Sequence, residues 1–142
     1  MESINPTQEA RIWQRVRGNP PQEHTLEQLL ALEAEFRQIC QYLQRNTPLR
    51  DSRGLNRLRE ESGRFYHILL GLAQILEQDV TVTAPPAVRG NAGGLLRQSY
   101  ATRQRSIALL EHLPLEERKL LKQKMEAHCL SILELLGSLP RK

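Results

Sequence analysis

The chain has 142 residues, of which 39% are hydrophobic, 25% charged and 4% aromatic, and this length and composition suit one domain with a sizeable core and exclude a disordered chain. Its net charge is +4, but the arginines are scattered instead of forming one basic face, so we expect no nucleic-acid partner. Its apolar runs fall far short of the ~20 residues that span a bilayer and no leader opens the chain, so we expect no membrane partner and a cytoplasmic protein.

Residues 1–24 are expected to form a lead-in segment, followed by one helical domain over residues 25–142. A short amphipathic helical patch contains Ile12, Trp13 and Val16 before Gly18 and two prolines interrupt it. Two interpretations of this patch stay open. In the first, Trp13 covers one end of the core; in the second, the segment docks onto a partner protein.

The first full helix is predicted from Thr25 to Arg45, with Gln28 completing a capping box. Glu33 falls inside its apolar stripe, and Glu35 lies at the edge of that stripe, together with Tyr42. The apolar positions of this helix are Leu26, Leu29, Leu30, Leu32, Phe36, Ile39, Cys40 and Leu43. Cys40 and Cys129 have no metal-type spacing, so we expect two buried free thiols.

The second helix covers Leu55 to Glu77, the longest uninterrupted helical pattern in the chain. Asn46–Pro48 makes a short connection before it, which predicts antiparallel neighbours, and Pro48 suits the first turn of the next helix. Glu61 lies on the apolar stripe, whereas His67 points the opposite way. The stripe itself is Leu58, Phe65, Ile68, Leu69, Leu72, Ile75 and Leu76.

The segment from Asp79 to Gly94 is rich in Thr, Pro and Gly and has no helical period. The second helix would be roughly 36 Å long, and a linker of about 15 residues can stretch to roughly 50 Å. We therefore predict a crossover that returns along the bundle and starts the third helix parallel to the second. The alternative is an up-down bundle with a loose hairpin.

The third helix is predicted over Leu95–Leu113, and Pro114 is predicted to start the fourth, with Glu116 and Glu117 in its first turn. Arg103 falls among the apolar residues of the third helix, and these are Leu96, Tyr100, Ile107 and Leu110. His128 belongs to the stripe of the fourth helix, which is Leu121, Met125, Cys129, Ile132, Leu136 and Leu139.

Each helix thus carries one polar residue at a core-facing position: Glu33, Glu61, Arg103 and His128. With these residues and the crossover, the chain over residues 25–139 resembles the ferritin-like superfamily, particularly the small rubrerythrin-type bundles. That resemblance implies an all-α four-helix bundle with a long crossover between helices two and three. It also implies a site for two iron or manganese ions, held by a Glu from each of two helices and a Glu-x-x-His pair from each of the other two.

The family pattern is incomplete in this sequence. Arg64 stands at the histidine position that follows Glu61, Arg103 or Gln104 replaces the acid of the third helix, and Met125 replaces the acid three residues before His128. A guanidinium next to two divalent metals would be repelled by several kcal/mol. We therefore expect no cofactor, and an interior ion-pair network of Glu33, Glu61, Arg103 and His128.

Three functions follow as hypotheses. The first is a non-catalytic ferritin-like bundle that binds a protein partner or self-associates. The second is an iron or manganese redox protein of the rubrerythrin kind, with metal ligands drawn from Glu33, Glu35, Glu61 and His128. The third is a structural helical adaptor unrelated to ferritins. No motif of a nucleophilic or hydrolytic enzyme is present, which favours a protein without enzymatic activity.

Overall fold

The computed structural model describes residues 24–82, 84–113 and 116–140, and these residues form an all-helical structure without strands. The helices are α2 (Thr25–Asn46), α3 (Arg53–Ile75), α4 (Ala92–Leu110) and α5 (Glu117–Ser138), with the short 3₁₀ helix η1 (Pro48–Asp51) between the first two. The expected all-α class with four long helices is therefore confirmed. The predicted lead-in segment with Trp13, and the predicted helix start at Pro114, lie outside the described residues.

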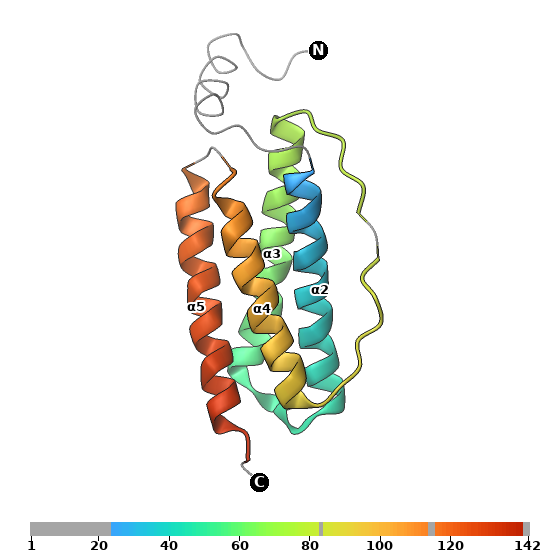
Figure 1. Ribbon diagram of the computed structural model, residues 1–142, viewed down its shortest axis with the longest axis vertical. Helices are drawn as coiled ribbons and strands as arrows, with labels where there is room; N and C mark the ends of the chain where they lie inside the picture. Colours follow the sequence, from blue (N-terminus) through green and yellow to red (C-terminus); the bar gives the residue numbers. More distant parts are fainter. Residues whose placement is uncertain (1–23, 83, 114–115, 141–142) are drawn as a thin grey trace.

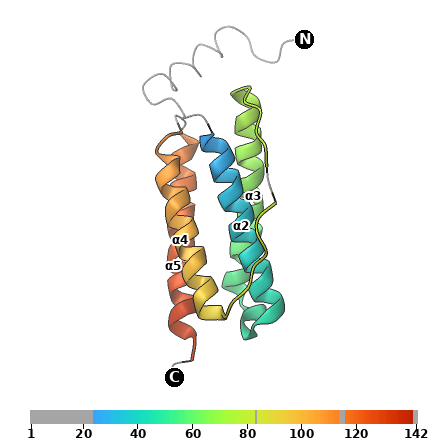
Figure 2. The same ribbon diagram turned by 45° about the vertical axis from the view of Figure 1, so that its right-hand side comes forward.

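The four long helices pack side by side as a bundle (Figures 1 and 2). α2 contacts α3 and α4, and α5 contacts α4 and α3. Sixteen residues, 76–91, lead from the end of α3 back along the outside of the bundle to the opposite end, where α4 begins (Figure 1). α4 therefore runs parallel to α3, as a crossover requires, and each pair of contacting helices is antiparallel.

The start of α2 differs from the predicted capping box. His24 is the N-cap, with a φ of 73°, and its side chain caps no backbone N–H of the first turn. Its Nδ1 instead lies 2.7 Å from Oε1 of Glu27, and its carbonyl accepts from the backbone N–H of Gln28 at 2.9 Å. Thr25 lies inside the helix and is buried. The prediction of Thr25 as a capping residue was wrong because its side chain packs into the end of the core.

The other helix boundaries are fixed by short polar side chains. Thr47 accepts from the N–H of Leu49 at the start of η1, so Pro48 opens a 3₁₀ turn and not the next α-helix. Ser52 then caps α3 by accepting from Leu55 at 3.3 Å. Asn91 caps α4 at Ala92, three residues before the predicted start, and α4 ends at Leu110, three residues before the predicted end.

Two apolar clusters fill the bundle, one toward each end. One contains Leu26, Leu30, Phe65, Leu69, Leu110 and Met125 among others, and the second contains Phe36, Ile39, Leu43, Leu58, Leu96 and Ile132. Burial of these side chains supplies the main stabilisation of the fold. The free thiols of Cys40 and Cys129 are buried as predicted, and burial raises the pKa of Cys40 to about 12.

Two residues of the predicted α3 stripe lie outside the core. Ile68 is 47% and Ile75 48% exposed, whereas Ser62 and Ala73 are buried. The buried face follows the spacing of Leu55, Leu58, Ser62, Phe65, Leu69, Leu72 and Leu76, which alternates steps of three and four residues along one narrow seam. The broader stripe was wrong because α3 packs against two of the long helices, α2 and α5, along this seam.

None of the helices in the described part of the chain is long and apolar enough to cross a membrane.

Candidate functional site

The four polar residues singled out in the helices meet at mid-height in the bundle, between the two apolar clusters. Glu33 comes from α2, Glu61 from α3, Arg103 from α4 and His128 from α5. Hydrogen bonds join all four in one chain of contacts. We call these four residues the polar centre.

Glu33 and Arg103 form a two-pronged ion pair at the middle of the polar centre. Nη1 of Arg103 donates to Oε1 of Glu33 at 2.9 Å, and Nη2 donates to Oε2 at 2.7 Å. Both side chains are almost completely shielded from solvent. Ser62 of α3 adds a third donor, because its hydroxyl donates to Oε2 of Glu33 at 2.5 Å. The planar guanidinium fork matches the carboxylate, which is the geometry that makes such pairs strong.

His128 links this ion pair to Glu61. Its Nδ1 lies 3.1 Å from Nε of Arg103, and its Nε2 lies 2.6 Å from Oε1 of Glu61. An arginine nitrogen can only donate, so Nδ1 of His128 must accept, and the ring proton therefore sits on Nε2 and is donated to Glu61. Both ring nitrogens are thus occupied when the imidazole is neutral.

The surroundings keep His128 in its neutral form. Burial lowers its pKa to about 4, and the neighbouring charge of Arg103 acts in the same direction. The hydrogen bond and the negative charge of Glu61, and the charge of Glu33, oppose this shift but do not overcome it. At neutral pH His128 therefore adds no positive charge to the polar centre.

Two phenylalanine rings pack against the polar centre. The guanidinium carbon of Arg103 lies 3.8 Å from the ring centroid of Phe36 and 5.5 Å from that of Phe65. The imidazole of His128 stacks on the same rings, at centroid distances of 5.9 and 5.3 Å. A desolvated guanidinium over an aromatic face gains a favourable cation–π interaction. The rings also exclude water from the ion pair.

Glu61 is the one member of the polar centre that reaches solvent, with 25% of its side chain exposed. Its negative charge is therefore partly hydrated, whereas the charge of Glu33 is neutralised by Arg103. This arrangement explains why three charged groups can share the middle of a small bundle. The buried charges are paired and the remaining charge touches water.

The residues present do not fit a di-metal centre. Arg103 occupies the position at which the family resemblance expects a carboxylate, and both nitrogens of His128 already have partners. Among the described residues, no three His, Cys, Asp or Glu side chains are grouped so as to hold a metal ion.

The remaining candidates lie away from the polar centre. Glu35 accepts from Thr102 at 3.1 Å and from Gln98 at 3.3 Å, on the seam between α2 and α4. Gln104 is exposed and donates to the sulfur of Cys129, and Arg64 is exposed on α3. His67 is also exposed, as predicted; its Nδ1 lies 2.9 Å from the carbonyl oxygen of Gly63, and its ring meets that of Tyr66 edge-on.

Sequence reasoning missed three contributors to the polar centre: Ser62, Phe36 and Phe65. Their spacing contains the signal. Phe36 follows Glu33 by three residues and Phe65 follows Ser62 by three, so each ring lies one helical turn from the polar residue that it covers. An aromatic residue one turn from a core-facing polar residue, on each of two helices, indicates a buried polar group that is covered by rings.

Comparison of this chain with protein-family models, with curated proteins and with solved structures finds no match.

Proposed function

We propose that this chain is a ferritin-like bundle in which an ion-pair network stands where related proteins hold a di-metal centre, and that it acts as a non-catalytic binding or interaction module. The observation that carries the proposal is the position of Arg103, whose guanidinium is fully buried and bonded to Glu33 and His128. The crossover between α3 and α4, and the one ionisable residue that each helix contributes to the polar centre, support the ferritin-like part.

Electrostatics supports the absence of a resident metal pair. Two divalent ions bring about four positive charges, and the guanidinium of Arg103 would add a fifth at close range in a dry site. Displacement of Arg103 from the site would leave Glu33 without its partner. The polar centre is thus self-sufficient, since each buried charge is already neutralised by protein groups.

Burial supports a non-catalytic role. Glu33 and Arg103 are inaccessible, and the rings of Phe36 and Phe65 pack against the guanidinium. A reacting molecule would have to reach these groups through the packed core. We therefore assign the polar centre to stability and to fixing the mutual positions of the four helices, and we place any binding function on the outer surface.

Metal analysis tests this proposal. The natural protein and an Arg103→Glu variant are expressed with iron and manganese supplied, purified without chelators and assayed by elemental analysis. We expect no stoichiometric metal in the natural protein. The variant supplies a carboxylate beside Glu33, Glu61 and His128, so we expect it to gain metal and to show a melting temperature that rises when metal is added.

Arg105→Glu is the matched control, because Arg105 is exposed on the same helix and the substitution changes the net charge equally. We expect no metal in this control. About two metal ions per natural chain would overturn the proposal and favour the redox hypothesis. A metal-free natural protein with no gain in Arg103→Glu would remove the ferritin-like part and leave a helical binding module.

A further inference from the structure

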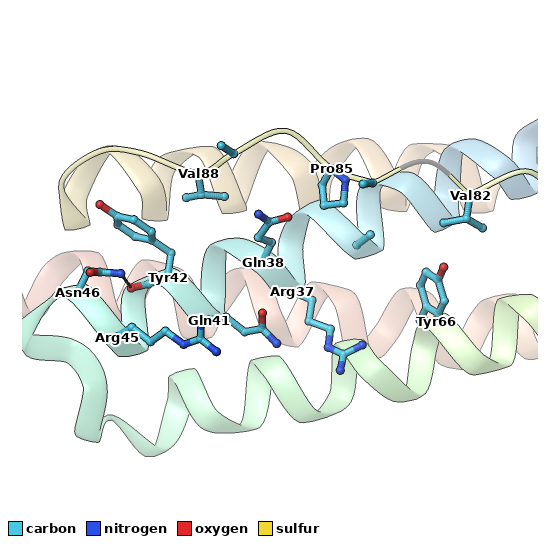
Figure 3. A pocket seen from close by; sticks show the side chains of 13 residues that line it. Arg37, Gln38, Gln41, Tyr42, Arg45, Asn46, Tyr66, Val82, Pro85 and Val88 are labelled. Atoms are coloured by element: carbon cyan, nitrogen blue, oxygen red, sulfur yellow. Dashed lines mark hydrogen bonds between the residues drawn. The ribbon is translucent and has the colours of Figure 1, made fainter.

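A groove of about 800 Å³ lies between α2, the crossover and Tyr66 of α3 (Figure 3). Its floor is the outer face of α2 from Ala34 to Asn46, a length of roughly 18 Å. The crossover forms the opposite wall through Val82, Ala84, Pro85, Ala87 and Val88. The groove is large enough for a sizeable ligand, and its long axis follows α2.

The groove is cationic. Arg37 and Arg45 line it, with Gln41 one turn from each, and no acidic side chain lines it. Among the described residues, neither arginine has an ion-pair or hydrogen-bond partner. Two unneutralised guanidinium groups on one wall of a groove favour a ligand that carries negative charge.

A third arginine, Arg59, lies on the seam between α2 and α3. Nη2 of Arg59 and Nε2 of Gln44 both donate to Oδ1 of Asn56, at 3.4 and 2.7 Å. The buried Nε of Arg59 has no hydrogen-bond partner within the described part of the chain. Arg59 itself does not line the groove.

The spacing of the arginines matches an extended peptide. Residues four apart on a helix rise about 6 Å, so the backbone positions of Arg37 and Arg45 are about 12 Å apart along α2. Residues two apart on a strand rise about 6.7 Å, and residues four apart about 13 Å. Carboxylates at alternate positions of an extended peptide would therefore meet Arg37, Gln41 and Arg45 in turn.

The opposite wall suits the other face of such a peptide. Val82, Pro85 and Val88 of the crossover line the groove and are apolar, and in an extended peptide the side chains between the acids point toward this wall. The backbone of the crossover also offers partners. Among the described residues from 79 to 90, only Thr81 has a hydrogen-bonded backbone group, to Glu27 at 2.6 Å. Free backbone groups beside a groove can pair with an added strand.

We propose that this groove binds an extended acidic segment of a partner protein, with carboxylates at alternate residues facing Arg37 and Arg45 and apolar side chains facing the crossover. This inference rests on the proposed function as a binding module and names the chemistry of the partner. It uses the outer face of α2, whereas the polar centre uses the inner face. The two proposals can therefore fail separately.

Binding is measured by fluorescence anisotropy of the full chain with a labelled peptide of about seven residues, in which glutamate alternates with valine. A peptide of the same composition with its glutamates grouped at one end, a lysine–valine peptide and a short single-stranded DNA are the comparison probes. We expect the alternating acidic peptide to bind saturably, and added salt to lower its affinity. The affinity of the grouped peptide should be severalfold lower.

The variant Arg37→Gln/Arg45→Gln should lower the affinity about tenfold or more, because two charge-assisted contacts are lost. The matched control is Arg57→Gln/Arg97→Gln, which removes the same charge from two exposed arginines outside the groove and should leave the affinity within about twofold. Circular dichroism checks that both variants are folded. Backbone NMR of the labelled protein should show peptide-induced shifts confined to α2, the crossover and the region of Tyr66.

Several outcomes would overturn the inference: no binding of the acidic peptide, equal loss in both double variants, or tighter binding of the DNA than of the peptide. None of these bears on the metal content of the polar centre. Conversely, a metal-bound natural protein with intact peptide binding would remove the proposed non-catalytic role and leave the groove as a docking site.

Discussion

Arg103 is the residue on which the middle of the bundle depends. It is fully buried, it satisfies the carboxylate of Glu33 with two hydrogen bonds and it donates a third to His128. A buried ion pair gains little over a well-packed apolar pair, but removal of one partner leaves an uncompensated charge in a dry site. The consequences of substitution are therefore asymmetric.

Arg103→Met should lower the free energy of unfolding by about 3–5 kcal/mol, because it leaves Glu33 buried without its cation. The double variant Glu33→Gln/Arg103→Met should recover a substantial part of that loss, since no charge remains unpaired. Urea denaturation of both variants measures the difference. Arg105→Met, on the exposed face of the same helix, should change stability by no more than about 0.5 kcal/mol. Equal destabilisation by all three would contradict this account.

The stability of the fold should depend on the titration of His128. The folded state lowers the pKa of His128 to about 4, mainly through burial, whereas in the unfolded chain the imidazole has its ordinary value near 6.5. Between these values the unfolded state binds the extra proton. Stability should therefore fall as the pH drops from about 6.5 to about 4, by on the order of 3 kcal/mol from this residue.

His128→Gln isolates this contribution, because the carboxamide keeps one donor and one acceptor but does not titrate in this range. Thermal unfolding from pH 4 to 8 should show a steeper decline for the natural chain than for the variant. His67→Gln, at an exposed histidine of α3, should leave the decline unchanged. Parallel profiles for the natural chain and His128→Gln would show that the imidazole is not held neutral.

At the scale of single elements, Asn91 fixes the start of α4, the helix that carries Arg103. Asn91 adopts an extended backbone, with φ −87° and ψ 168°, and its Oδ1 accepts from the N–H of Gly94 at 2.7 Å. This bond satisfies one of the free N–H groups of the first turn directly after the crossover. The crossover therefore ends, and the helix begins, at Asn91.

Asn91→Ala should destabilise the protein by about 1 kcal/mol, through loss of that cap. Asn91→Ser keeps an acceptor at the N-cap and should cost much less. Chemical denaturation gives the free energies, and amide hydrogen exchange at Gly94 gives the local effect, which should be faster in the alanine variant only. Unchanged exchange at Gly94 in Asn91→Ala would show that the cap does not hold the first turn.

At the scale of the whole molecule, the crossover sets the topology. It connects the end of α3 with the start of α4 at the opposite end of the bundle, a distance comparable to the roughly 28 Å length of the 19-residue α4. Its length is therefore a geometric requirement, and the same segment also forms one wall of the groove over α2.

Deletion of residues 80–88 leaves a connection that reaches only about 25 Å when fully stretched, so α4 could no longer start parallel to α3 and Arg103 could no longer meet Glu33. We expect a large loss of cooperative thermal unfolding or a change of oligomeric mass by light scattering. Deletion of residues 84, 86 and 87 alone leaves ample reach and should preserve both properties. A cooperative fold of unchanged mass and stability after the longer deletion would contradict the crossover topology.

Much of this architecture was predictable because it depends on local patterns. The period of apolar residues indicated the helices, and the short link at Asn46–Pro48 and the long segment after α3 indicated one tight turn and one crossover. The same periodicity placed Glu33, Glu61, Arg103 and His128 on inward faces. The errors were local too, since Ile68 and Ile75 satisfy a broad helical stripe but the contact with two neighbours buries only a narrow seam.

The sequence by itself determined the class of the fold, the order and approximate bounds of its helices, and the polar residue that each turns inward, because these follow from propensity and periodicity along the chain. Only the tertiary structure decided that Arg103 pairs with Glu33 and not with Glu61, that His128 bridges the two, and that Phe36 and Phe65 enclose them. It alone also brought the crossover alongside Arg37 and Arg45. Pairing of this kind depends on the rotation and height of each helix against its neighbours, to within a hydrogen-bond length, and no pattern within a single helix specifies these.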